Sequence, residues 1–142
     1  MDKVLLTPLK IIDAKGGRVF HGIKKNSQGY TEFGEAYFSE IRHNEIKAWK
    51  KHKRMTMNLV VPVGKVKFVI YDDRSLKNKI FQEVILSPSN YQRLTIPPMI
   101  WFGFKGIAKK DSIILNIADI LHESTEAENK NIEELNFNWS KK

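Results

Sequence analysis

Short apolar runs bounded by turn residues dominate the chain from residue 59 onward. The first run, 59–72, is dense in β-branched and aromatic residues, and after Gly64 it alternates apolar with polar positions, as a half-buried strand does. Further runs, separated by segments rich in turn residues, follow at 80–86, 91–96, 100–104 and 112–120. Strands of this length and spacing predict an all-β protein, an antiparallel sandwich or barrel.

Two places depart from this pattern. Pro62 interrupts the first run, so we expect an edge strand or a bulge there. A weak helical period lies in the acidic stretch 123–135. With no internal repeat and no low-complexity linker, we expect one domain over 1–142, with N-terminal strands and a loop at 1–35, a barrel core at 36–120 and a C-terminal extension at 121–142.

Composition narrows the class of protein. The chain has 142 residues, 42% of them hydrophobic, which is enough to fill the interior of one domain. It has no cysteine, which excludes disulfides, thiolate zinc sites and a cysteine nucleophile. Neither a signal-peptide core nor a membrane span can be drawn. We expect a soluble, cytoplasmic protein with no membrane partner.

The positive charge is concentrated at one place. The formal net charge is +8, yet residues 119–134 contain six acids and one lysine, whereas five cations lie within residues 47–54. This distribution favours a local site for a phosphorylated ligand over a general basic coat. A nucleic-acid patch or a solvated edge are the alternatives. Because the run KKHKR at 50–54 lacks interleaved aromatic residues, we do not expect a nucleic-acid partner.

Several catalytic classes are disfavoured by missing motifs. The four histidines (His21, His43, His52 and His122) are too far apart in sequence for a local metal-ligand pair, so no metal is expected. There is also no nucleophile elbow, no P-loop and no glycine-rich dinucleotide turn. We therefore expect a protein without a bound cofactor.

Residues 46–74 resemble the sugar-nucleotide cupins, above all the dTDP-4-dehydrorhamnose 3,5-epimerase family. His52 falls on the histidine that ends the family's Arg-Gly-Leu-His element, and Gly64 falls on its turn glycine. Asp72 and Arg74 fall on the aspartate and arginine that end the next strand. The related dTDP-sugar 3,4-ketoisomerases are also similar, since their His-Ala-His-Lys element matches the KKHK at 50–53.

Two later segments extend the resemblance, which covers about residues 15 to 139. IPPMIWFGF (96–104) is similar to the family's Ile-Pro turn and the strand after it. LNIADILHESTE (115–126) is similar to its Tyr-Lys-x-Thr segment with the trailing glutamate.

The resemblance implies a fold and an activity. The fold is the cupin, a double-stranded β-helix or jelly-roll barrel. The activity is epimerisation or isomerisation of a nucleotide-diphosphate-linked 4-keto-6-deoxy sugar, by proton abstraction next to the ketone, in deoxy-sugar and cell-surface polysaccharide biosynthesis. His52 is the candidate general base, and the cations around it favour the neutral ring that a base needs. The expected substrate-binding residues are Lys47, Lys50, Lys51, Lys53, Asp72, Arg74 and Trp101.

Each candidate also has a purely structural interpretation. His52 is alternatively a solvated surface group. Asp72 and Arg74 are alternatively an ion pair at a strand end. Trp101 is on the opposite face of its strand from Phe104, and both are alternatively packing residues, with Trp101 or Phe102 free to stack on sugar or base.

Other positions depart from the family. Leu115 stands at the family's proton-returning tyrosine, Phe102 at a histidine and Trp49 at an arginine. The C-terminal element with the aspartate that orients the histidine is not matched. Tyr30 and Tyr37 are candidates to replace the acid. The alternative function is therefore a non-catalytic cupin that binds a nucleotide sugar or a partner protein.

The composition of the N-terminal segment predicts how the chain associates with a second copy. Residues 20–38 combine glycines with five aromatic side chains, too little polarity for a free tail. The edge strands of a small barrel also need cover. We therefore expect a homodimer in which the N-terminal strands of one subunit extend the sheet of the other.

Overall fold

A computed structural model describes residues 3–75 and 79–140, and it confirms the all-β fold. No α-helix occurs in these ranges. The strands are β1 (Leu5–Pro8), β2 (Ile11–Ala14), β3 (Gly17–Phe20), β4 (Glu35–Ile41), β5 (Ile46–His52), β6 (Met57–Val63), β7 (Val66–Tyr71), β8 (Phe81–Leu86), β9 (Gln92–Ile96), β10 (Trp101–Gly106), β11 (Ser112–Ala118) and β12 (Ala127–Asn129).

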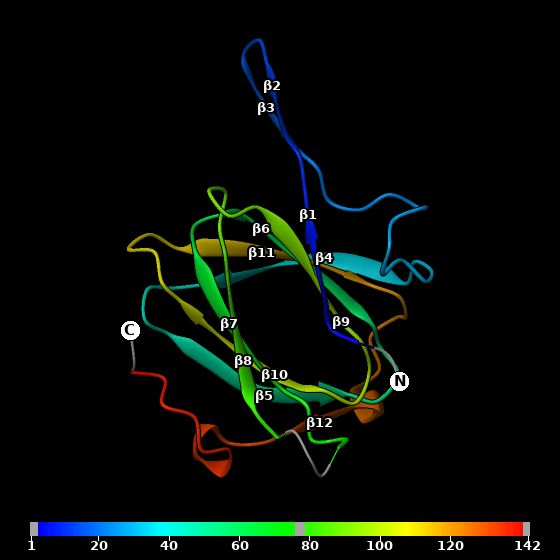
Figure 1. Ribbon diagram of the computed structural model, residues 1–142, viewed down its shortest axis with the longest axis vertical. Helices are drawn as coiled ribbons and strands as arrows, with labels where there is room; N and C mark the ends of the chain where they lie inside the picture. Colours follow the sequence, from blue (N-terminus) through cyan, green and yellow to red (C-terminus); the bar gives the residue numbers. More distant parts are fainter. Residues whose placement is uncertain (1–2, 76–78, 141–142) are drawn as a thin grey trace.

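Two five-stranded antiparallel sheets form the barrel. Their orders are β1-β9-β6-β11-β4 and β12-β5-β10-β7-β8, and β2 pairs only with β3. The sheets enclose a common interior (Figure 1), which is the jelly-roll arrangement of a cupin. Neighbours in a sheet are mostly distant in sequence, so the fold depends on long-range pairing.

The main core lies between the sheets. It is built from the inward positions of alternating strands, such as Leu59 of β6, Phe68 of β7 and Ile114 of β11. Each of these side chains is at most 4% exposed. Because successive strand residues point to opposite faces, the residues between these positions face the outer side of their sheet, where some, such as Val69, are covered by a second cluster.

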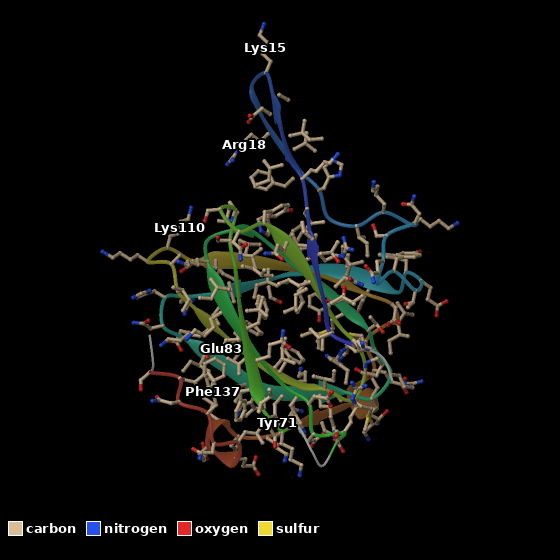
Figure 2. The ribbon with its side chains drawn as sticks, in the orientation of Figure 1. Lys15, Arg18, Tyr71, Glu83, Lys110 and Phe137 are labelled. Atoms are coloured by element: carbon tan, nitrogen blue, oxygen red, sulfur yellow. The ribbon has the colours of Figure 1, made fainter. Side chains whose placement is uncertain are left out.

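A second apolar cluster lies on the outer face of the β5–β10–β7 sheet. Trp49, Val69 and Trp101 from this sheet pack with Trp139 near the end of the described chain. The indole ring centroids of Trp49 and Trp139 are 5.2 Å apart. In Figure 2, Phe137 and Tyr71 mark this outer layer. The C-terminal segment therefore covers the outside of the sheet, and 3₁₀ turns at Ser124–Glu126 and Ile132–Glu134 replace the weakly predicted helix.

Gly64 and Pro62 shape the end of β6 and the turn into β7. Gly64 joins β6 to β7 with φ +89, and a Cβ there would lie 2.2 Å from the Ser112 hydroxyl oxygen. Only glycine fits both constraints. Pro62 marks a break in the pairing register of β6 with β11, which confirms the expected bulge. The alternative of an edge strand is wrong, because β6 lies between β9 and β11.

The three N-terminal strands differ in whether they pair with the barrel. β1 pairs with β9 of the same chain, whereas the β2–β3 hairpin projects from the barrel (Figure 1). No helix within the described ranges is long and apolar enough to cross a membrane.

Candidate functional site

A cavity of about 440 Å³ opens into the barrel interior, within the range usual for small-molecule sites. Its inner part is apolar and is formed by Met57, Leu59, Phe68, Phe104 and Ile114. Polar side chains line the rest, namely Tyr37, Ser39, Lys47, Lys50, His52, Asn116, Asn129 and Lys130. The cavity can therefore hold a ligand with an apolar end and a polar or charged end.

A bulge in β5 brings three predicted site residues to this cavity. Lys50 pairs with Phe102 of β10 and Ala48 with Gly103, so Trp49 is an extra residue in the ladder. In a regular strand Lys47 and Lys50 would face opposite sides. The extra residue resets the alternation, so that both lysines and His52 line the cavity.

His52 is held by a buried carboxylate. Its Nδ1 is hydrogen-bonded to Oε1 of Glu126, and the two residues are 6% and 2% exposed. A carboxylate only accepts hydrogen bonds, so Nδ1 carries the hydrogen and the lone pair of a neutral ring is on Nε2. The ring also stacks on Phe102, with centroids 6.0 Å apart and an interplanar angle of 18°.

The backbone around Glu126 stabilises its charge. Its Oε2 accepts hydrogen bonds from the backbone N–H groups of Arg54 (3.2 Å) and Met55 (3.3 Å). Burial raises the pKa of this carboxyl, but the hydrogen bonds from His52 and the two backbone groups outweigh it and hold the pKa below its usual value. Glu126 is therefore an ionised orienting group for the imidazole.

A phenol and an amide form part of another wall. Tyr37 of β4 and Asn116 of β11 are register partners, and both line the cavity. Asn116 Nδ2 donates a hydrogen bond of 2.9 Å to the Tyr37 hydroxyl oxygen. Leu115, at the position of the family's tyrosine, is on the opposite face of β11, because the inward positions there are Ile114 and Asn116.

The electrostatics of the cavity are one-sided. Among the described residues that line it, Lys47, Lys50 and Lys130 are cationic and none is acidic. Asn129 and Lys130 reach the cavity because β12 pairs with β5. Lys47 and Lys50 are exposed, so these cations lie on the solvent side of the cavity, where they attract a polyanion. The arrangement fits a diphosphate near a basic rim and an apolar group deeper inside.

The structure places two predicted site residues on the outer face of the same sheet. Lys51 forms a 3.1 Å ion pair with Glu128. Trp101 is 3% exposed and belongs to the outer aromatic cluster. The Nζ atoms of Lys51 and Lys130 each lie 4.9 Å from its ring centroid. Neither Lys51 nor Trp101 lines the cavity; Phe102, the next residue, does.

Three other predicted residues also lie outside the cavity lining. Lys53 is exposed, and its backbone N–H donates to the Glu126 carbonyl. Arg74 donates to Asp72 through Nε and Nη2, both at 2.9 Å. Hydrogen bonding from Arg74 holds the pKa of Asp72 below its usual value, against a smaller opposing effect of burial. This pair matches the strand-end interpretation.

The sequence interpretation missed Glu126, Asn116, Asn129 and Lys130. The only available signal was the trailing glutamate of the segment 115–126, which is Glu126 itself. Glu126 orients His52 although the family's C-terminal element with the aspartate is not matched. Within the described ranges, no group of three His, Cys, Asp or Glu residues could hold a metal ion.

Comparisons with known proteins concern the chain as a whole. No family model matches the chain. A curated relative, the probable low-salt glycan biosynthesis epimerase Agl13 of Haloferax volcanii, is 27% identical over 100 residues, which cover 68% of this chain and 64% of that protein. The matched region thus spans less than two thirds of this relative.

Solved structures extend the comparison. A dTDP-sugar isomerase from Desulfovibrio desulfuricans G20 is 36% identical, with a TM-score of 0.91 over 96% of this chain and 90% of the other. The dTDP-4-dehydrorhamnose 3,5-epimerase of Bacillus anthracis, solved with TDP and PPi bound, shares the fold at 21% identity, with a TM-score of 0.80 over 96% and 85% of the two chains. The chain therefore belongs to the sugar-nucleotide cupins, the family of dTDP-sugar epimerases and isomerases.

Proposed function

We propose that this protein epimerises or isomerises a 4-keto-6-deoxy sugar carried on a nucleoside diphosphate, with His52 as the general base. The observation that carries the proposal is the buried His52–Glu126 pair, because it aims a basic nitrogen into a cavity with a cationic rim and an apolar interior. The sugar's methyl group suits the apolar part, and the diphosphate suits Lys47 and Lys50.

The chemistry begins at His52. Its Nε2 takes a hydrogen, as a proton, from the ring carbon next to the ketone. The electrons of that C–H bond form the carbon–carbon double bond of an enolate, and the carbonyl electrons move to the oxygen. Lysine ammonium groups in the cavity stabilise this negative charge. The imidazolium that forms is stabilised by the Glu126 carboxylate.

The second half returns a proton to carbon. Delivery to the opposite face of the same carbon gives the epimer. Delivery to the former carbonyl carbon gives the isomeric ketone, provided that the proton of the neighbouring hydroxyl moves to the former carbonyl oxygen. We assign the acid to Tyr37, because its hydroxyl lies in the cavity lining and is bonded to a buried amide. A candidate base, His52 held by Glu126, and a candidate acid, Tyr37 bonded to Asn116, favour an enzyme over a cupin that only binds nucleotide sugars.

The test is hydrogen exchange with solvent. Wild-type protein incubated with dTDP-4-keto-6-deoxyglucose in deuterium oxide should exchange a ring hydrogen next to the ketone, observed by NMR, and should form an epimer or isomer. Binding without exchange over hours would instead identify a binding module. An absence of binding would remove the nucleotide sugar from consideration.

The two faces of β5 provide a prediction about binding. Lys50→Gln should weaken the affinity for dTDP about tenfold at low salt, because a charge-assisted contact with the diphosphate is lost. Lys51→Gln removes the same charge one residue away on the outer face, so its effect should be less than about twofold. Calorimetric titration of both variants at two salt concentrations measures this difference, which screening should reduce. Equal losses in both variants would contradict the assignment of Lys50.

We also propose a homodimer in which the β2–β3 hairpin packs on a second copy. Ile12 and Val19 are register partners on this hairpin and are 45% and 51% exposed. Figure 2 shows Lys15 and Arg18 on the same projection. Sedimentation should give a dimer for the wild type and a monomer when both residues are changed to Asp, because buried charge is unfavourable in an apolar contact. A wild-type monomer at micromolar concentration would rule the dimer out.

A role in deoxy-sugar biosynthesis for cell-surface polysaccharide, in the cytoplasm, completes the proposal. Its support is the family to which the chain belongs. Sugar analysis of surface glycans from a strain lacking the gene tests this role. An unchanged deoxy-sugar content would count against it.

A further inference from the structure

Asn116 is a polar residue in an apolar part of the barrel. It belongs to β11, where the inward neighbours on the same face are Ile114 and Ala118 of the main core. It is 3% exposed and lines the cavity. A buried amide is unfavourable unless its donors and acceptor are satisfied, so the partners of this side chain require an explanation.

Half of this amide has a partner. Nδ2 donates to the Tyr37 hydroxyl oxygen at 2.9 Å, across the neighbouring strands β11 and β4 (Figure 1). Oδ1 is fully buried and has no hydrogen-bond partner. An unpaired buried acceptor of this kind costs roughly 1–3 kcal/mol. Among the described residues, the hydrogen-bond partner of this side chain is therefore the Tyr37 hydroxyl.

The direction of the hydrogen bond decides where the phenol proton points. Because the Tyr37 oxygen accepts from Asn116, its own O–H hydrogen is directed elsewhere. Tyr37 lines the cavity, so this hydrogen is available to a ligand there. The same N–H group also stabilises the phenolate that remains after the proton has left.

We propose that Asn116 is a positioning residue for the acid step: its N–H group directs the Tyr37 proton into the cavity. This inference rests on the function proposed above. In the step itself the Tyr37 O–H bond breaks, and the enolate electrons form a C–H bond with that proton. The phenolate then takes a proton from water, and the His52 imidazolium releases one to water.

The experiment separates the base step from the acid step. Exchange of the ring hydrogen with deuterium needs only His52, whereas formation of the epimer or isomer also needs Tyr37. Asn116→Leu preserves the approximate volume and removes both polar groups. With dTDP-4-keto-6-deoxyglucose, we expect this variant to exchange hydrogen within about fivefold of the wild-type rate and to form product about 10- to 100-fold more slowly.

Asn116→Asp tests the direction of the hydrogen bond between Asn116 and the Tyr37 hydroxyl. It also keeps the proposal testable if Asn116→Leu fails to fold. An ionised carboxylate only accepts hydrogen bonds, so it would turn the Tyr37 proton away from the cavity. Product formation should then fall at neutral pH and recover as the pH is lowered and the new carboxyl gains a proton. Wild-type product formation by Asn116→Asp at neutral pH would overturn the proposal.

A double-mutant cycle with Tyr37→Phe tests whether Asn116 acts through Tyr37. Residues that act as one unit are not additive, so Asn116→Leu combined with Tyr37→Phe should form product no more slowly than Tyr37→Phe alone. Multiplied losses, or equal losses of exchange and product formation in Asn116→Leu, would overturn the proposal. A wild type that neither binds nor exchanges would instead refute the proposed function.

Discussion

His52→Asn should slow both hydrogen exchange and product formation by about 10²- to 10⁴-fold while the affinity for dTDP changes little. Asparagine keeps a donor that can reach Glu126 but cannot accept a proton at neutral pH. The phosphate contacts that we assign come from Lys47 and Lys50, which the substitution leaves in place. The measurement combines deuterium exchange by NMR with calorimetric titration of dTDP.

A comparison at another histidine controls for nonspecific effects. His43 is exposed, with Nδ1 3.0 Å from the Ala108 carbonyl oxygen, and it does not line the cavity. His43→Asn should therefore exchange at the wild-type rate. If His52→Asn also exchanged at that rate, the base would have to be another group, and Tyr37 would be the next residue to test.

Glu126→Gln should have the second large effect, on stability and on activity. A buried hydrogen bond to a charged group contributes roughly 1.5–3 kcal/mol to the unfolding free energy, and the neutral His52 ring makes such a bond to the Glu126 carboxylate. The amide would also bring donors toward the backbone N–H groups of Arg54 and Met55, where the carboxylate now accepts. Product formation should fall at least about 100-fold, because the imidazole loses the acceptor that fixes its tautomer.

The contribution of Glu126 to the unfolding free energy should decrease as the pH falls. The pKa of Glu126 in the folded chain is held below its ordinary value of 4.5. A carboxyl whose folded pKa is lowered adds stability above the unfolded value, and this contribution is lost as the pH falls through the folded value. Denaturant unfolding between neutral pH and pH 3 should therefore show a steeper loss for the wild type than for Glu126→Gln.

Glu123 offers a matched control three residues earlier. It pairs with Arg54 at the surface, where both side chains are more than half exposed. Such pairs are screened by solvent and contribute about 0–1 kcal/mol, so Glu123→Gln should unfold almost like the wild type. Equal losses of stability in the two variants would show that burial of the Glu126 carboxylate is not what matters.

Most of the strands could be predicted from local pattern. The apolar runs at 80–86, 91–96, 100–104 and 112–120 became β8 to β11, each displaced by at most two residues. This succeeded because the alternation of side chains along a strand is a local property. β4 and β5 were not predicted, because Glu35–Ile41 and Ile46–His52 mix charged and aromatic residues without a clean alternation.

The pattern of the sequence by itself determined an all-β sandwich or barrel, since strand alternation depends on neighbouring residues. The cupin barrel and the role of His52 followed from the resemblance of residues 46–74 to the sugar-nucleotide cupins. The tertiary structure alone decided which cations share a cavity with that histidine, because the extra residue at Trp49 moves Lys47 to the same face as Lys50. It also brought Glu126 to His52, 74 positions away, and Asn116 to Tyr37, 79 positions away. Such pairs depend on strand register, which is set by the packing of two whole sheets and not by any local segment.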